Sequence, residues 1–179
     1  YQLGVDILGE IERSSDGRLL AIQNAGFALD LSENGNVLAV GYPGGSVCKF
    51  LLCHSFVRVF KLTETNEWDP LGSSGVLFDD TESRQAGWAV ALAANGLTVA
   101  IGGPSLFQSG DPGLVRVYSY GAVASDWNLV GQDVVGEVED AAAGFAVDLA
   151  ADGRTLVVGA PYARDLAGYV RILRLSEED

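Results

Sequence analysis

Few of the residue types that commonly carry out chemistry occur in this chain. His54 is the only histidine among 179 residues. A protein metal site usually needs three or four ligands, and a serine hydrolase needs a histidine held between a nucleophile and a carboxylate. A lone histidine supplies neither arrangement, so we interpret His54 as an ordinary loop residue. The sequence therefore predicts a protein that is not an enzyme and has no catalytic residue, metal site or cofactor.

The two cysteines, Cys48 and Cys53, are five positions apart. This spacing does not fit a redox CxxC motif or a zinc knuckle. A disulfide between them would suit an oxidising compartment. Two free thiols fit the sequence equally well, because proximity in sequence does not establish bridge geometry. Both interpretations stay open.

Acidic residues dominate the charge. Lys and Arg total 11 against 24 Asp and Glu, giving a formal net charge of −13. Such a surface disfavours nucleic acid and anionic membranes, which require basic faces. The acidic residues recur in clusters that could be divalent-cation sites, but we favour solvated loops. The clusters are Glu10 and Glu12; Asp79, Asp80 and Glu82; and Glu137, Glu139 and Asp140.

Three arginines occupy matching places in similar segments: FVRVFKL, LVRVYSY and YVRILRL, which contain Arg58, Arg116 and Arg171. They could form a ring around a ligand. We favour the alternative that they lie on a strand face and pair with local carboxylates, which is a weak interaction at a protein surface.

A repeat organises the elements that position these residues. Three segments align without gaps, opening at Gly26, Gly87 and Gly144. Each has an aromatic residue second, a turn glycine nine positions after the opening glycine, another glycine at fifteen and a proline at seventeen. The opening glycines thus recur about every sixty residues. A period of this length indicates one supersecondary unit repeated along the chain. The segments read GFALDLSENGNVLAVGYP, GWAVALAANGLTVAIGGP and GFAVDLAADGRTLVVGAP.

Each unit reads as a series of strands. Apolar residues alternate with small or polar ones after the opening glycine, which is typical of a strand with one packed face. An Asn-Gly or Asp-Gly pair then predicts a tight two-residue hairpin turn. Apolar second strands follow at 37–40, 97–101 and 155–158, then third strands with the arginines, and fourth strands after Trp68 and Trp127. The N-terminal YQLGVDILGEIE matches the fourth strand WNLVGQDVVGEVE, pairing Leu3 with Val130 and Asp6 with Asp133.

This pattern predicts an all-β fold with almost no helix, namely a β-propeller of four-stranded antiparallel blades. A β-sandwich is the competing fold, but it does not require such a repeat. We expect one region, 1–179, with units at about 1–24 (the last strand of a blade), 25–85, 86–142 and 143–179. Its twelve strands make three sheets of four if the two ends pair. A propeller normally has about four to eight blades, so we expect further blades, copies or partners to complete the ring. Trp68, Trp88 and Trp127 are expected to pack between blades.

The Gly-aromatic pairs Gly26-Phe27, Gly87-Trp88 and Gly144-Phe145, with GYP, GGP and GAP after the second strand, resemble the FG-GAP repeat of integrin α chains and related proteins. The resemblance covers nearly all of 1–175 and implies a propeller. Integrin-type repeats carry a calcium loop between their first two strands. Calcium takes six to eight oxygen ligands, whereas LAANGLTVAI contains no carboxylate at this place. We therefore predict that the calcium sites are absent.

These features predict a non-catalytic module for protein–protein or ligand binding and assembly, which makes contact through its inter-strand loops. The alternatives are a structural subunit of a large extracellular or organellar assembly, and an enzyme whose active site is completed by blades not present here. Expected partners are proteins or further blades, without nucleic acid or membrane insertion. The expected location is secreted, cell-surface or in an organelle lumen. The expected contact loops are 42–55, 105–113 and 162–168, with Tyr42, Lys49, His54, Phe107, Asp111, Tyr162, Arg164 and Asp165 as candidate contact residues.

Overall fold

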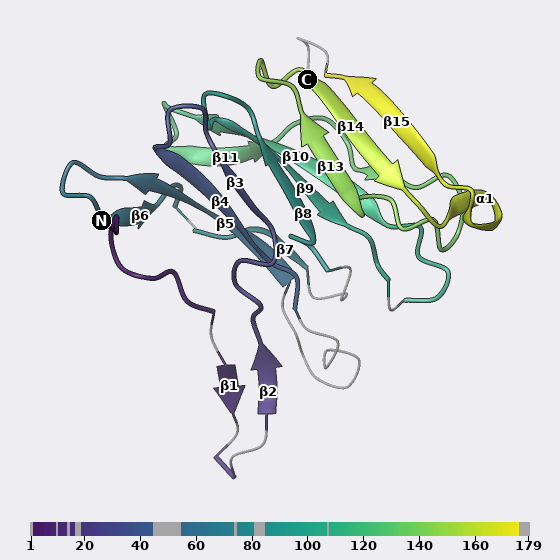
Figure 1. Ribbon diagram of the computed structural model, residues 1–179, viewed down its shortest axis with the longest axis horizontal. Coiled ribbons are helices and arrows are strands. Elements are labelled where there is room, and N and C mark those ends of the chain that lie inside the picture. The colour runs from purple at the N-terminus through teal and green to yellow at the C-terminus, as the bar shows by residue number, and fades with distance from the viewer. Residues whose placement is uncertain are drawn as a thin grey trace.

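The computed structural model describes residues 2–9, 11–13, 15–16, 19–44, 55–73, 75–80, 85–106 and 108–175. These residues form antiparallel sheets that stand side by side along the chain (Figure 1). The one helical element among these residues, α1 (Ala163–Leu166), is a single turn. The prediction of an all-β chain with almost no helix is confirmed for the described residues.

Three sheets correspond to the three repeat units, and we call them blades 1 to 3. Blade 1 has the order β3-β4-β5-β6, with β7 also on β5; blade 2 has β8-β9-β10-β11, with β12 also on β10; blade 3 has β13-β14-β15. Blade 1 contains β3 (Leu29–Leu31), β4 (Val37–Tyr42), β5 (Ser55–Leu62), β6 (Trp68–Pro70) and β7 (Leu77–Asp80). Blade 2 contains β8 (Ala89–Leu92), β9 (Thr98–Gly103), β10 (Leu114–Gly121), β11 (Asp126–Leu129) and β12 (Val134–Val135). Blade 3 contains β13 (Ala146–Leu149), β14 (Thr155–Ala160) and β15 (Tyr169–Arg174).

The fourth strand of blades 1 and 2 is interrupted. In blade 2, β11 pairs with one half of β10, between Tyr118 and Gly121, and β12 pairs with the other half, at Leu114 and Val115. Blade 1 divides its fourth strand in the same way into β6 and β7. The predicted fourth strands therefore exist, but each consists of two short pieces on one long neighbour.

The hairpin turns are longer than predicted. In blade 1 the Ser32 N–H donates to the Val37 carbonyl over 2.9 Å, so the loop comprises residues 33–36 rather than two residues. Only the glycine has a left-handed backbone, with φ of 72° at Gly35. The Asn34 side-chain oxygen accepts the Asn36 N–H at 3.0 Å, which tightens the loop. This side-chain bond favours a wider turn than the Asn-Gly pair alone predicts.

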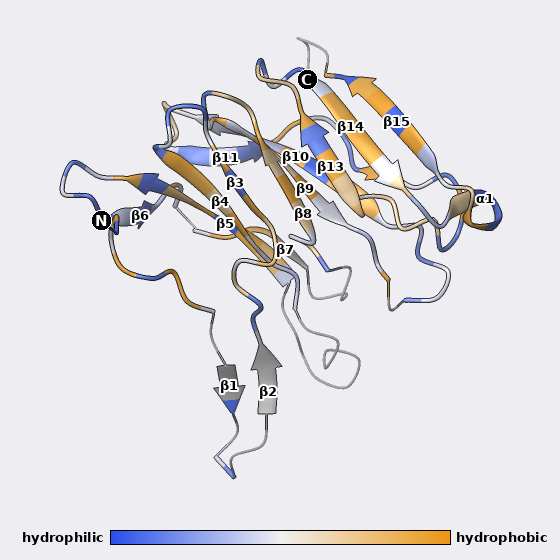
Figure 2. Cartoon of the chain, in the orientation of Figure 1, coloured by the Kyte–Doolittle hydropathy of each residue, from blue (hydrophilic) through white to orange (hydrophobic). Residues whose placement is uncertain are grey.

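The core lies between the blades. The blade 1 residues Ala39, Val57 and Val59 pack against Val99 and Ile101 of blade 2. A second cluster joins blade 2 to blade 3 in the same manner. The central strands β4, β9 and β14 are largely hydrophobic along their length (Figure 2). Because each blade hides its apolar faces on its neighbours, the stacked sheets form a propeller-type arrangement rather than a closed sandwich.

Within the described ranges, the N-terminal and C-terminal segments do not pair with each other to make a third four-stranded sheet. Blade 3 has three strands, and β1 (Ile11–Arg13) pairs only with β2 (Leu19–Ile22), in a hairpin that projects away from the sheets (Figure 1). Residues 2–9 contain no strand. Instead, Ile7 packs against the outer apolar cluster of blade 1. Three stacked blades are fewer than the roughly four to eight of a closed propeller, so blade 1 and blade 3 do not meet in this stack.

Candidate functional site

The expected contact loops leave the sheets at one common end. Antiparallel pairing places the start of each first strand beside the end of each second strand, as Leu29 opposite Val40 shows in blade 1. The same pairing holds in blades 2 and 3. The opening aromatic residues therefore lie at the same end of the sheets as the loops that follow the prolines. We call this end the proline rim; it contains Pro43, Pro104, Pro161 and the described residues of the loops after them.

A row of aromatic rings crosses the proline rim from blade to blade. The ring centroids of Phe27 and Trp88 are 4.6 Å apart, and those of Trp88 and Phe145 are 5.7 Å apart. Tyr162, from the loop after Pro161, approaches Phe145 edge-on at 5.9 Å. Phe27 is 49% exposed and Tyr162 is 47% exposed. We call these four residues the aromatic row, a feature that the sequence analysis did not single out although an aromatic follows every opening glycine.

The loop after Pro161 holds three of the predicted contact residues. Tyr162, Arg164 and Asp165 are all exposed. Arg164 (φ 54°), Asp165 (φ 55°) and Leu166 (φ 69°) have consecutive left-handed backbones. Non-glycine residues rarely adopt this conformation, and its occurrence is often associated with functional loops. The Gly168 N–H closes the turn by donating to the Ala163 carbonyl at 2.9 Å.

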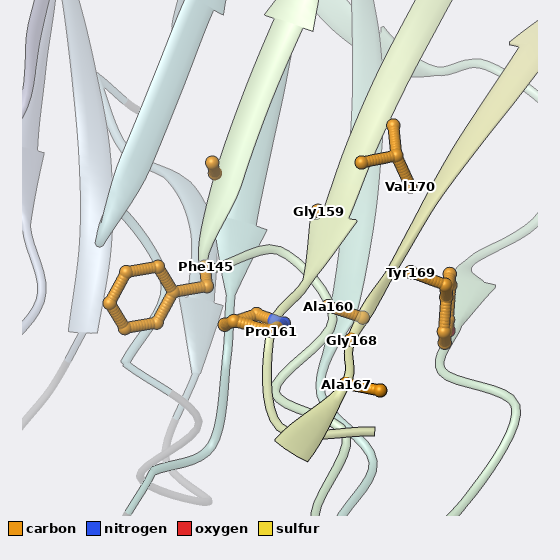
Figure 3. A pocket seen from close by; sticks show the side chains of 9 residues that line it. Phe145, Gly159, Ala160, Pro161, Ala167, Gly168, Tyr169 and Val170 are labelled. Atoms are coloured by element: carbon orange, nitrogen blue, oxygen red, sulfur yellow. The ribbon is translucent and has the colours of Figure 1, made fainter. Parts of the chain in front are cut away.

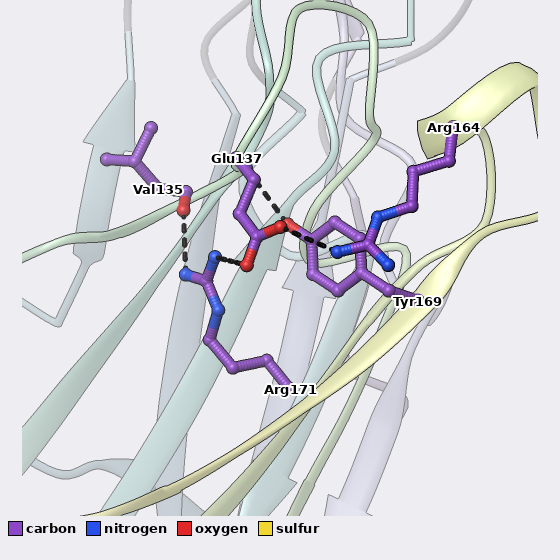
Figure 4. A network of polar contacts seen from close by, with 5 residues as sticks. All are labelled: Val135, Glu137, Arg164, Tyr169 and Arg171. Atoms are coloured by element: carbon purple, nitrogen blue, oxygen red, sulfur yellow. Dashed lines mark hydrogen bonds and ion pairs between the residues drawn. The ribbon is translucent and has the colours of Figure 1, made fainter.

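Glu137 links this loop to β15. Its carboxylate accepts hydrogen bonds from Arg171 at 2.9 Å and Arg164 at 3.2 Å (Figure 4). Arg171 also donates to the Val135 carbonyl at 3.0 Å, and the Glu137 N–H donates to the Tyr169 hydroxyl at 3.0 Å. The hydrogen bonds from Arg171 first, and then from Arg164, lower the pKa of the Glu137 carboxyl. The network therefore ties the loop to the edge of blade 3.

The aligned arginines lie on strand faces, as predicted. Arg116 donates to both carboxylate oxygens of Asp133, at 2.7 and 2.9 Å, and its guanidinium lies 4.3 Å from the centroid of the Phe78 ring in blade 1. The hydrogen bond that Arg116 donates to Asp133 is the largest contribution to the raised pKa of Arg116. Arg58 instead lies over the rings of Tyr42 and Phe56. The prediction of local carboxylate pairing is thus confirmed for Arg116 and Arg171, whereas Arg58 stacks on aromatic rings.

A hollow of about 360 Å³ opens beside blade 3 at the proline rim. Phe145, Gly159, Pro161 and Val170 lie around it (Figure 3). Its lining is mainly apolar, with no charged side chain. Such a surface suits an apolar partner better than a polar reaction. In the described part of the chain, no three His, Cys, Asp or Glu side chains gather as a metal site would require.

The remaining predicted site residues have varied placements. Tyr42 is fully buried and stacks on Phe56, with ring centroids 4.7 Å apart, so its side chain belongs to the core rather than to a contact surface. Asp111 is partly buried and its carboxylate accepts the Gly113 N–H at 2.9 Å. In the third acidic cluster, Asp140 accepts the Gly110 N–H at 2.8 Å, which gives it a structural role. The residues outside the described ranges are Glu10, Cys48, Lys49, Cys53, His54, Glu82 and Phe107.

Two of the three tryptophans, Trp88 and Trp127, contact neighbouring blades as predicted. The Trp127 indole N–H of blade 2 donates to the Leu71 carbonyl of blade 1 at 2.7 Å. Trp88 contacts Phe27 and Phe145, which belong to the blades on either side. Trp68 packs on the outer cluster of blade 1.

None of the helices in the described residues has the length and apolar character needed to cross a membrane.

Comparison with known proteins supports the fold. No model of a known protein family matches the chain, and no curated protein does. Among solved structures, a candidate 6-phosphogluconolactonase from Bacteroides uniformis matches with a TM-score of 0.56 at 14% identity, covering 94% of this chain and 47% of the other. Kuenenia stuttgartiensis hydrazine synthase matches with a TM-score of 0.51 at 14% identity, covering 84% of this chain and 45% of the other.

Both matched chains have β-propeller folds, and this chain spans less than half the length of either. The chain is therefore an all-β protein with a propeller-type arrangement of antiparallel blades. At this level of identity, the likeness concerns the fold and leaves activity open.

Proposed function

We propose that this chain is a non-catalytic binding and assembly module of the FG-GAP-like propeller type, and that its proline rim contacts a protein partner or ligand. The observation that carries the proposal is the aromatic row. Exposed aromatic side chains that form a continuous patch are a common feature of protein interaction sites. Here the rings lie at the same end of the sheets as loops of different length on a repeated scaffold, the arrangement by which binding surfaces vary without disturbing a core.

The FG-GAP assignment is supported by the roles of its glycines. A side chain at Gly41 would collide with the carbonyl oxygen of Gly87, and one at Gly102 would collide with that of Gly144. The GYP and GGP motifs thus provide room for the opening glycine of the next unit. This explains why the Gly-aromatic pair and the later glycine occur together in each repeat.

We also infer that the hairpin loops do not bind calcium. Side-chain oxygens of Asn34, Asn95 and Asp152 accept backbone N–H groups within their own turns. Calcium needs several free carboxylates in such a loop. Millimolar calcium should therefore leave the melting temperature unchanged; a clear rise would contradict the inference.

The binding proposal is tested by affinity enrichment from an extract of the source organism, with quantitative mass spectrometry. A variant carrying Trp88→Leu and Tyr162→Ala should lose the partner that the unaltered chain enriches. Val123→Ala is the matched control, because Val123 is fully exposed in the β10–β11 turn at the other end of the sheets. Equal enrichment by all three proteins would contradict a role for the aromatic row, and circular dichroism checks that the variants remain folded.

A further inference from the structure

The outer face of blade 3 is made of residues that are buried in the other two blades. Val57 of blade 1 and Val115 of blade 2 are each 0% exposed, because the next blade covers them. Val170, which occupies the same repeat position in blade 3, is 67% exposed. The adjacent positions follow the same pattern, with Val59 1%, Val117 3% and Ile172 69% exposed.

The opposite face of the molecule, on blade 1, shows the complementary pattern. Leu31 is 51% exposed, whereas its equivalents Leu92 and Leu149, which pack on the preceding blade, are 7% and 6% exposed. Beside Leu29, Leu38 and Val40 lies a hollow of about 370 Å³, bounded on its other side by the N-terminal residues. The blade 2 equivalents of those three residues are Val90, Val99 and Ile101, which pack with Val57 and Val59 of blade 1.

The repeated glycines reveal a matching pair of open contacts. The backbone of Gly87 in blade 2 packs directly against Gly41 in blade 1. The backbone of Gly144 in blade 3 packs against Gly102 in blade 2 in the same way. A Cβ added at Gly159, the third member of this series, would meet only Ala146, at 3.5 Å or more. At the other end of the molecule is Gly26, the first opening glycine, where an added Cβ would meet nothing within 4 Å.

Backbone hydrogen bonds also link each blade to the next, at the end of the sheets where the hairpin loops lie. The Glu33 N–H of blade 1 donates to the Ala94 carbonyl of blade 2 at 3.0 Å. The Ala94 N–H donates in turn to the Ala151 carbonyl of blade 3, also at 3.0 Å. Continuing this series requires an acceptor for the Ala151 N–H, and the repeat places the Glu33 carbonyl of another blade 1 there.

The N-terminal residues already lie where the fourth strand of a preceding blade belongs. Ile7 packs on blade 1 as its equivalent Val134 packs on the cluster that contains blade 3. Gly4 lies against the Trp68 ring as its equivalent Gly72 lies against the Trp127 ring. Blade 3 has no fourth strand among the described residues. Residues 3–9 therefore have the position of a fourth strand in a blade that precedes blade 1, and blade 3 of a second copy is a blade that lacks this strand.

One charge pair follows from this match. In blade 2, Arg116 on β10 forms two hydrogen bonds with Asp133, just before β12. Arg171 is the equivalent arginine in blade 3, and Asp6 is the N-terminal equivalent of Asp133. The side chains of Asp6 and Arg171 are thus expected to meet where the N-terminal strand joins another chain.

We propose that two copies of this 179-residue chain join head to tail, with blade 3 of each packed on blade 1 of the other, to form a closed six-bladed ring. The inference rests on the assembly part of the proposed function. One copy supplies three blades, too few to close, and three copies would supply nine, beyond the usual range of about four to eight. With two copies, the same contact is made twice around a two-fold axis, so no apolar end remains exposed.

The oligomeric state gives the first test. Native mass spectrometry and light scattering of the purified 179-residue chain at tens of micromolar should give twice the mass of one chain. Ile172→Glu should abolish the dimer and leave a folded monomer, because Ile172 is exposed within one chain. The matched control, Val123→Glu, should remain dimeric. A monomeric unaltered chain, an open-ended series of oligomers, or a dimer that survives Ile172→Glu would overturn the proposal.

Charge exchange tests the direction of the contact. Asp6→Arg and Arg171→Asp should each weaken the dimer by at least tenfold in Kd. Mixed one to one, the two variants should form a heterodimer, because each junction then holds one arginine and one aspartate. Circular dichroism checks that both variants are folded, and failure of two folded variants to form the heterodimer would overturn the proposal.

The two proposals can fail separately. Ile172 lies midway along β15, opposite Val157, and is not part of the aromatic row. A monomeric Ile172→Glu variant should still enrich the partner of the proline rim. Conversely, the variant with Trp88→Leu and Tyr162→Ala should remain dimeric while losing that partner.

Discussion

The three aligned arginines show how equivalent residues acquire different contacts. Arg116 lies between Asp133 of its own blade and the Phe78 ring of the preceding one. Arg171 instead reaches Glu137, from the link that precedes its blade. The repeat fixes the strand face on which each arginine lies, whereas the neighbouring loops determine which partner it meets.

The Glu137 network predicts a dependence of stability on pH. The pKa of the Glu137 carboxyl is lower in the folded state than the ordinary value of 4.5, so the folded state binds fewer protons in this range. The stabilisation is therefore complete above pH 4.5 and is lost as the pH falls through the lowered pKa. Urea unfolding at pH 7 should show that Glu137→Gln is less stable than the unaltered chain. At low pH the difference should disappear. Glu139→Gln is the control, and an equal effect there would contradict the prediction.

The left-handed turn after Pro161 predicts a stabilising substitution. Leu166 has a φ of 69° and is 76% exposed, so its side chain contributes little burial while its backbone is strained. A left-handed backbone costs a non-glycine residue about 1–2 kcal/mol, and glycine removes this cost. Glycine also raises the entropy of the unfolded chain, which offsets part of the gain in stability. Leu166→Gly should raise the free energy of unfolding by about 0.5–1 kcal/mol in urea denaturation. Leu166→Ala removes the same side chain but retains the strain, and should give no such gain.

At the scale of elements, the interrupted fourth strands connect neighbouring blades. Between β6 and β7, the Leu71 carbonyl of blade 1 accepts the Trp127 indole N–H of blade 2 at 2.7 Å. This bond joins two sheets whose backbones are not paired with each other through a ladder. The break in the strand therefore provides a polar contact between blades.

This contact predicts a difference between two equivalent tryptophans. Trp127→Phe should lower the free energy of unfolding by about 1 kcal/mol, because a partly buried hydrogen bond is lost while most of the packing remains. Trp68→Phe makes the same change at the outer face of blade 1, and should cost less. Chemical denaturation of both variants measures the difference; a greater loss at Trp68 would contradict the assignment of the Leu71 contact.

The sequence predicted the strands better than their connections. Gly26, Gly41 and Pro43 recur at fixed spacing, and each spacing corresponds to a backbone requirement that is the same in every blade. The length of the hairpin loops was wrong because side-chain bonds such as that of Asn34 widen the turn. The division of the fourth strand was missed because residues 71–76 and 130–133 continue the polar and apolar mixture of the flanking strands.

On the scale of the whole molecule, the candidate site depends on features beyond one repeat. The positions of Phe27, Trp88 and Phe145 were predictable from the repeat, but their contact across three blades depends on how the blades stack. Tyr162 joins the row through a loop of irregular conformation, for which the sequence has no periodic signal. Its exposure, by contrast, agrees with its prediction as a contact residue.

A head-to-tail dimer predicts that thermal stability depends on protein concentration. Association stabilises the folded state by mass action. The melting temperature of the unaltered chain should therefore rise over a hundredfold increase in concentration, whereas that of Ile172→Glu should stay constant. A concentration-independent melting temperature for the unaltered chain would exclude a dimer that exchanges with monomer in this range.

The open side of β15 has a consequence for handling the protein. Among the described strands, β15 pairs only with β14, so one row of its backbone N–H and C=O groups faces outward. Such rows recruit strands from other molecules, and charged side chains on the strand oppose this. Arg171 and Arg174 supply that charge here. In the proposed dimer, residues 3–9 of the second copy cover this edge of β15. Without residues 2–9 the edge would stay open, and we expect the shortened protein to be prone to fibril formation.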